Sequence, residues 1–228
     1  MNPVFVAPAF ITFTGVDTVA LIPGMRRLSA QYPIEWGVLI DPARHGHPLF
    51  PEGSVIDRLR ACGLRLSAHV CGEPASRIAN GLEAGVALTG FSRIQINHGM
   101  RGSSLGQIER CMRFAARHGL RPALQCQEAF PEVTGVDWLY DVSFGNGVQP
   151  GKWLPLGGDI PFCGYSGGLN AQNVSSILQR LELRGGRDYW IDMESGVRTD
   201  GHFDLAKCEA VCQAVYGQAS AGLAQALP

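Results

Sequence analysis

The sequence predicts a single (β/α)8 barrel, an α/β fold, and three observations support this prediction. Short apolar runs alternate with longer amphipathic segments along the chain, which is typical of βα units around a parallel sheet. The chain has 228 residues, of which 46% are apolar, and this is near the usual size of such a barrel. Two strand ends near the C-terminus carry glycines, as the phosphate sites of these barrels do after strands 7 and 8. We therefore expect one domain that spans residues 1–228.

The first half of the chain supplies four of the expected strand–helix units. The strands are expected at residues 9–13, 36–40, 64–70 and 93–97, and the helices at residues 17–31, 54–62, 74–88 and 104–118. A bend is expected near Pro23 in the first helix, whereas Pro74 suits the first turn of the third. Gly119 marks the end of the fourth helix.

The second half supplies four more strands but fewer helices. The strands are expected at residues 123–127, 138–140, 161–165 and 189–193, and the helices at residues 171–183 and 204–216. Too little sequence separates strands 5 and 6 for a full helix, so we expect a short helix or a loop there. Because barrels of this class carry their sites at the C-terminal ends of the strands, the residues at those ends are the functional candidates.

Composition and charge argue against several classes of partner. The net charge is −1 and no run of Lys or Arg occurs, so we expect no nucleic-acid partner. The apolar N-terminus has no basic residue before it and contains prolines, which favours a buried first strand over a signal peptide or a membrane span. The seven cysteines show no metal-binding spacing, and we interpret them as reduced thiols of a cytoplasmic protein. We expect a monomer or a homodimer.

The glycines at two strand ends suggest an anion site. Gly167 and Gly168 follow one strand and precede a predicted helix, and Ser195 and Gly196 follow the next strand. Glycine lets the backbone approach a ligand closely, and the free N–H groups at a helix start favour anions. The alternative interpretation is two ordinary strand-to-helix turns.

The same stretches carry a family resemblance. SGGLNAQNV and IDMESGVRTDGHFDLAK resemble the last two strand–loop–helix units of the phosphoribosylanthranilate isomerases, the (β/α)8 enzymes of tryptophan synthesis. The resemblance implies that backbone amides of Gly167, Gly168, Ser195 and Gly196 hold a substrate phosphate, with Asn170 at the start of the helix. It is strong over the last third of the chain and thin before that.

Asp141 is the residue to which the resemblance gives an acid role. It ends the segment VDWLYD and precedes SFGNG, a glycine-rich turn that could close over a ligand. In the family an aspartate at this place protonates the furanose ring oxygen as the ring opens, and the resemblance implies this role for Asp141. The alternative is an aspartate that caps the following turn through its side-chain oxygen.

The base of the family reaction has no clear counterpart in this sequence. The family carries Lys-x-Cys-Gly at the end of strand 1, where the cysteine removes a proton from the sugar, and here Thr14 takes the cysteine position. A threonine hydroxyl needs an activating base beside it, so we expect weak turnover of phosphoribosylanthranilate. Cys71, Cys126 and His69 are the other candidates, although buried cysteines usually serve only to pack the core.

Two further residues are candidates for substrate contacts. Gln95 lies in RIQINHG, which resembles a strand-4 segment of the family, and Arg44 lies in the loop that supplies an arginine for the anthranilate carboxylate. The alternative for Arg44 is a solvated loop side chain. His45 and His47 resemble a metal pair but lack a third ligand in register, so we expect no metal. We also expect no organic cofactor, because proton transfer needs none.

The sequence therefore predicts an enzyme similar to phosphoribosylanthranilate isomerase, which isomerises a small phosphorylated sugar derivative by acid–base chemistry. One alternative keeps the phosphate site but changes the reaction to that of an aldolase, an epimerase or another isomerase. A second alternative is a barrel that binds a phosphorylated ligand and catalyses nothing, because a fold alone does not decide between functions.

Overall fold

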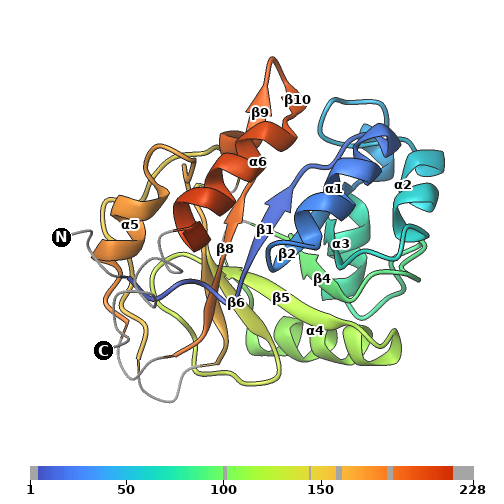
Figure 1. The fold of residues 1–228 in the computed structure, drawn as a ribbon. Coiled ribbons are helices and arrows are strands. Elements are labelled where there is room, and N and C mark those ends of the chain that lie inside the picture. Colours follow the sequence, from blue (N-terminus) through green and yellow to red (C-terminus); the bar gives the residue numbers. More distant parts are fainter. Residues whose placement is uncertain (1–4, 100–101, 144, 158–160, 184–186, 218–228) are drawn as a thin grey trace.

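The predicted barrel is confirmed by the computed structural model, which describes residues 5–99, 102–143, 145–157, 161–183 and 187–217. Eight parallel strands close into a ring in chain order, with the helices outside them (Figure 1). Within the described ranges, every helix is too short or too polar to cross a membrane.

The strands lie within a few residues of their predicted positions. They are β1 Phe10–Thr14, β2 Ile34–Ile40, β3 Leu66–Val70, β4 Arg93–Ile96, β5 Arg121–Cys126, β6 Asp137–Tyr140, β7 Cys163–Tyr165 and β8 Tyr189–Met193. The ring closes where β8 pairs with β1, with Thr12 opposite Asp192 and Phe13 opposite Met193.

The helices differ more from the prediction. They are α1 Ile22–Ser29, α2 Gly53–Arg60, α3 Gly72–Ala79, α4 Leu105–Arg117, α5 Val174–Arg180 and α6 Leu205–Cys212. Short 3-10 turns are η1 Val19–Leu21, η2 Pro42–Arg44 and η3 Ser195–Val197; η4 Gln213–Gly217 is a π-helical turn. A small hairpin of β9 Arg198–Thr199 and β10 His202–Phe203 follows η3. Residues 127–136 contain no helix, so the connection between β5 and β6 is a loop.

Two of the differences in helix boundaries have a clear local cause. The third helix ends at Ala79 rather than near residue 88, because Gly81 and Gly85 follow with φ values of +84° and +74° that a helix does not allow. The helix after β7 begins at Val174 rather than at Ala171. There the Asn170 side chain accepts hydrogen bonds from the backbone of Gln172 and Asn173, which forms a turn in place of the first helical residues.

The main core lies between the barrel wall and the helices. Alternation along each strand sends every second side chain outward, so that Ile11 and Phe13 of β1 join Trp36 and Val38 of β2 in this core. The intervening residues face the barrel interior, where the apolar filling is a small separate cluster of Phe10, Leu139 and Trp190.

Charged groups fill much of the remaining interior at the N-terminal end of the barrel. Arg93 is 4% exposed, its guanidinium lies 3.9 Å from the centre of the Trp190 ring, and its Nη2 is 3.3 Å from Oδ2 of Asp137. Asp137 also accepts hydrogen bonds from Arg121, the shortest at 2.6 Å. Buried charges are tolerated only when they are paired, so this pair fixes the arrangement of β4, β5 and β6.

We predict that Asp137→Asn will destabilise the protein strongly. The substitution removes the carboxylate that lies 3.3 Å from the buried Arg93 and leaves it only carboxylates beyond ion-pair distance, such as Glu35. Breaking a buried pair in this way costs about 3–5 kcal/mol. Urea unfolding of the two proteins measures the difference. Glu83→Gln is the control, because it removes the carboxylate partner of Arg117 and His118 at an exposed site and should change little. A similar small loss in both variants would contradict the prediction.

Candidate functional site

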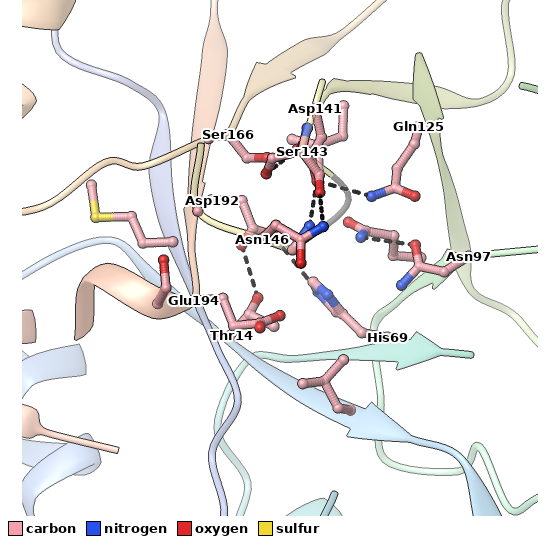
Figure 2. A pocket seen from close by; sticks show the side chains of 18 of the residues that line it. Thr14, His69, Asn97, Gln125, Asp141, Ser143, Asn146, Ser166, Asp192 and Glu194 are labelled. Atoms are coloured by element: carbon pink, nitrogen blue, oxygen red, sulfur yellow. Dashed lines mark hydrogen bonds and ion pairs between the residues drawn. The ribbon is translucent and has the colours of Figure 1, made fainter. Parts of the chain in front are cut away.

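A cavity of about 420 Å³ opens at the C-terminal ends of the strands, which is within the usual size range of small-molecule sites. Polar side chains reach it from most of the strands, as Figure 2 shows for those labelled there. The groups that matter for chemistry are Thr14, His69, Gln95, Gln125, Asp141, Asp192 and Glu194.

Thr14, Asp192 and His69 form one connected group in the cavity wall (Figure 2). The Thr14 hydroxyl donates a 2.9 Å hydrogen bond to Oδ1 of Asp192, and Nε2 of His69 lies 3.9 Å from Oδ2 of the same carboxyl. Burial raises the pKa of Asp192 well above its usual value, and the Thr14 hydrogen bond opposes this. The hydroxyl at the end of β1 therefore has a carboxyl group directly beside it.

His69 is a neutral imidazole at physiological pH. Complete burial is the main cause that lowers its pKa to about 3, and the positive charge of Arg93 adds to the shift. A base with so low a pKa takes a proton poorly near pH 7, which weakens His69 as a candidate base.

Asp141 is surrounded by hydrogen-bond donors. Its carboxylate accepts from Nε2 of Gln125 at 3.2 Å, from N and Oγ of Ser143 at 2.8 and 3.0 Å, and from N of Gly145 at 3.3 Å. This is the geometry of an aspartate that caps the following turn, the alternative that the sequence left open. Asp141 also lines the cavity, so capping does not remove it from reach of a ligand.

Glu194 also lines the cavity, although the sequence analysis did not select it. It follows β8, and no hydrogen bond or ion pair joins its side chain to another described residue. Burial is the main cause that raises its pKa to about 7; the charges of Arg198 and Arg44 oppose this, and that of Asp141 adds to it. The signal that could have revealed Glu194 is alternation, because Trp190 and Asp192 face inward on β8 and Glu194 is the next position in that pattern, directly after the strand.

The glycine turn after β7 lies at another part of the cavity wall. Gly167 and Gly168 have φ values of +113° and +62°, and neither N–H donates a hydrogen bond to another residue in the described part of the chain. The loop after β6 covers this turn, since a Cβ on Gly168 would lie 2.7 Å from the carbonyl oxygen of Gly147. Ser195, the first residue of η3, also lines the cavity.

Most of the residues selected from the sequence meet in this cavity, but three do not. Those that line it are Thr14, Arg44, His69, Cys71, Gln95, Asp141, Gly167, Gly168 and Ser195. Cys126 was placed wrongly, because its side chain lies on the outer face of β5 in the main core. Asn170 and Gly196 border a second hollow beside α6 instead. Gly196 packs so tightly against the Leu169 carbonyl that a Cβ would not fit.

The two cysteine candidates are poor nucleophiles and poor bases. Burial raises the pKa of Cys71 to about 11, although a hydrogen bond from Asn97 opposes this, and it raises the pKa of Cys126 to about 12. Only a very small fraction of either thiol is ionised at neutral pH. At the cavity rim, Arg44 stacks on the ring of Phe50 at 4.0 Å. Among the described residues, no three His, Cys, Asp or Glu side chains come together as metal ligands.

We predict that His69 makes stability depend on pH. Its pKa is lower in the folded state than in the unfolded state, so the unfolded chain binds more protons and stability falls as the pH drops from about 6.5 to about 3. Between pH 7 and pH 5 this single group should cost about 2 kcal/mol. Urea unfolding at both pH values should show a correspondingly smaller loss in His69→Gln.

His69→Asn serves as a second variant. It shows whether a change comes from the loss of the titrating imidazole or only from the way in which the glutamine side chain packs. If both variants lose as much stability between pH 7 and pH 5 as the wild type does, the histidine is not responsible for the pH dependence.

Comparison with known proteins supports the fold. No protein-family model matches the chain. A solved N-(5'-phosphoribosyl)anthranilate isomerase from Pyrococcus furiosus matches with 14% identity and a TM-score of 0.55, over 91% of this chain and 98% of that one. A mutant tryptophan synthase alpha-subunit from the same organism matches with 11% identity and a TM-score of 0.52, over 94% and 100% of the two chains. At these identities the likeness shows that the chain shares the (β/α)8 barrel fold of these proteins.

Proposed function

We propose that this chain is an enzyme that isomerises a phosphorylated sugar derivative similar to phosphoribosylanthranilate by acid–base chemistry. One observation carries the proposal: one cavity is lined both by Gly167 and Gly168, whose N–H groups donate to no other described residue, and by carboxyl groups at the ends of β6 and β8. An anion site supplies binding, and carboxyl groups supply proton transfer.

The phosphate end of the proposal rests on the two glycines and on Ser195. Consecutive N–H groups in left-handed turns form a concave surface that binds anions, and the N-terminus of the 3-10 turn η3 adds further donors beside it. The resemblance in SGGLNAQNV and ESGV supports the same assignment. Asn170 then has an indirect role, because it shapes the turn without lining the cavity.

The acid end of the proposal rests on Asp141. The resemblance gives it the role of protonating the ring oxygen, and its place in the cavity wall supports this. Of the donors around it, the Ser143 hydroxyl can rotate and accept a hydrogen bond instead, so a protonated Asp141 keeps a partner. Arg44 and Gln95 also line the cavity and are proposed to contact the part of the substrate beyond the phosphate.

We predict that Gly168→Ala will weaken the binding of inorganic phosphate and of ribose 5-phosphate. The added Cβ would lie 2.7 Å from the Gly147 carbonyl oxygen, in a backbone conformation that alanine rarely adopts. The turn must therefore shift, and its N–H groups no longer point at the anion. We expect a loss of at least about tenfold, or about 1.4 kcal/mol, by titration calorimetry.

Gly151→Ala is the matched control, because a Cβ there has no neighbour within 4 Å and the backbone is not in the left-handed region. Phosphate binding should be unchanged in this variant. Equal binding by Gly168→Ala and Gly151→Ala, or an anion found elsewhere in a phosphate-soaked crystal, would overturn the phosphate assignment.

We predict that the purified protein converts phosphoribosylanthranilate slowly, and that Asp141→Asn lowers turnover by at least about 10²-fold. Asparagine keeps the shape of the side chain but cannot deliver a proton. Phosphate binding should stay within a few-fold of wild type, which separates loss of the acid from loss of the ligand site.

Urea unfolding of Asp141→Asn provides the control for folding, because the variant also loses an acceptor for the turn. If activity falls only in proportion to the folded fraction, Asp141 is a cap and not the acid. Binding of phosphate esters without any turnover by the wild type would favour the non-catalytic barrel, and turnover of another phosphosugar would favour a different reaction on the same site.

A further inference from the structure

We propose that Glu194 is the general base of this reaction, the group that takes a proton from a substrate carbon and returns it to the neighbouring carbon. This inference rests on the proposed function and adds the residue for a step to which the sequence assigned none. It depends on the position of Glu194, on the absence of a hydrogen-bond or ion-pair partner for its side chain among the described residues, and on the hydrogen bonds and pKa values of the other groups around the cavity.

The register of the closed barrel places Glu194 beside Thr14. Phe13 pairs with Met193 across β1 and β8, and Thr14 and Glu194 are the next residues along the two chains. Both line the cavity, and both are visible there in Figure 2. Gly145, from the loop after β6, also faces this carboxyl, since a Cβ on it would lie 3.6 Å from Oε2 of Glu194. The carboxyl therefore stands in the cavity wall, between the end of β1 and the loop that follows Asp141.

The other candidate groups in the cavity wall are less suited to accept a proton. Thr14 already donates to Asp192, whose carboxyl is only 6% exposed. Asp141 accepts hydrogen bonds from at least four donors. His69 is a weak base because of its low pKa, and the Cys71 thiol stays protonated because its pKa is high.

Glu194 differs from these groups because its side chain has no hydrogen-bond or ion-pair partner among the described residues and its pKa is near neutral. Its pKa of about 7 means that both protonation states are populated at physiological pH, which suits a group that must take up and return a proton. The charged groups that act on it are Arg198, Arg44 and Asp141. Arg198 is engaged elsewhere, with hydrogen bonds to the Gly15 carbonyl and to Asp17, and so it does not pair with the carboxyl.

The proposed step conserves atoms and charge. Asp141 first gives a proton to the ring oxygen, and ring opening leaves a protonated imine at the first sugar carbon. The Glu194 carboxylate then removes the proton of the second carbon; the C–H electron pair forms a C–C double bond, and the imine electron pair moves onto nitrogen. Glu194 returns its proton to the first carbon as the enol becomes a ketone, and the enol proton goes back to Asp141.

Glu194→Gln tests the proposal with phosphoribosylanthranilate as substrate. We expect turnover to fall by about 10²- to 10⁴-fold, the usual loss when a positioned base is removed. Phosphate binding should stay within a few-fold of wild type. In the wild type, kcat should fall as the pH drops below about 7, because Glu194 is then protonated. This decrease, the acid limb of the pH–rate profile, should be absent in Glu194→Gln. Glu194→Asp should restore the limb and part of the rate.

Glu109→Gln is the matched control, since it removes a carboxylate on the exposed face of α4 and should leave rate and pH profile unchanged. Wild-type turnover with Glu194→Gln within about threefold would overturn the inference while the proposed function stands. So would an acid limb that survives in Glu194→Gln and disappears in Asp192→Asn, which would assign the base to Asp192. A wild type that turns over no phosphosugar would instead remove the proposed function, and this inference with it.

Discussion

The buried ion pair of Arg93 and Asp137 determines where a ligand can enter this barrel. Together with Trp190, it fills the N-terminal half of the interior, and Glu35 adds a second buried charge that is bonded to Thr12 and Arg65. Such groups are expensive to bury and need partners, and here they fill this end of the barrel. The cavity is left at the other end. The charge of Arg93 also helps to keep His69 neutral, which is consistent with the proposal that carboxyl groups at the cavity carry the protons.

Arg198 links the loops that surround the cavity. Its guanidinium donates to the Gly15 carbonyl at 2.8 Å, to Asp17 at 2.9 Å and to the Pro48 carbonyl at 2.8 Å, so one side chain joins the segments after β1, β2 and β8. Because Arg198 is committed to these partners, it does not pair with Glu194, although its charge still acts on that carboxyl. A salt bridge from Arg198 would instead favour the charged form of Glu194 and lower the pKa of this proposed base.

The sequence predicted the barrel well because strand patterns and glycine turns are local signals. Period-two alternation also explains why Gln125 of β5 lines the cavity whereas its neighbour Cys126 lies in the main core. The start of α5 was missed because a single side chain, Asn170, forms a turn where a helix was expected. The protonation of the site could not be predicted, because it depends on contacts such as that of Thr14 with Asp192, which are 178 residues apart in the chain.

The loop after β6 borders both the proposed phosphate site and the proposed acid. Asp141 holds the start of this loop through Gly145, and the loop then runs over the glycine turn, with the Gly147 carbonyl against Gly168. A phosphate bound at this glycine turn would therefore lie near a segment that is anchored on the proposed acid. Gly145 in the same segment faces Glu194. The proposed phosphate site and the proposed proton-transfer groups thus border one loop, which fits a substrate that carries its phosphate and its reacting carbon in one small molecule.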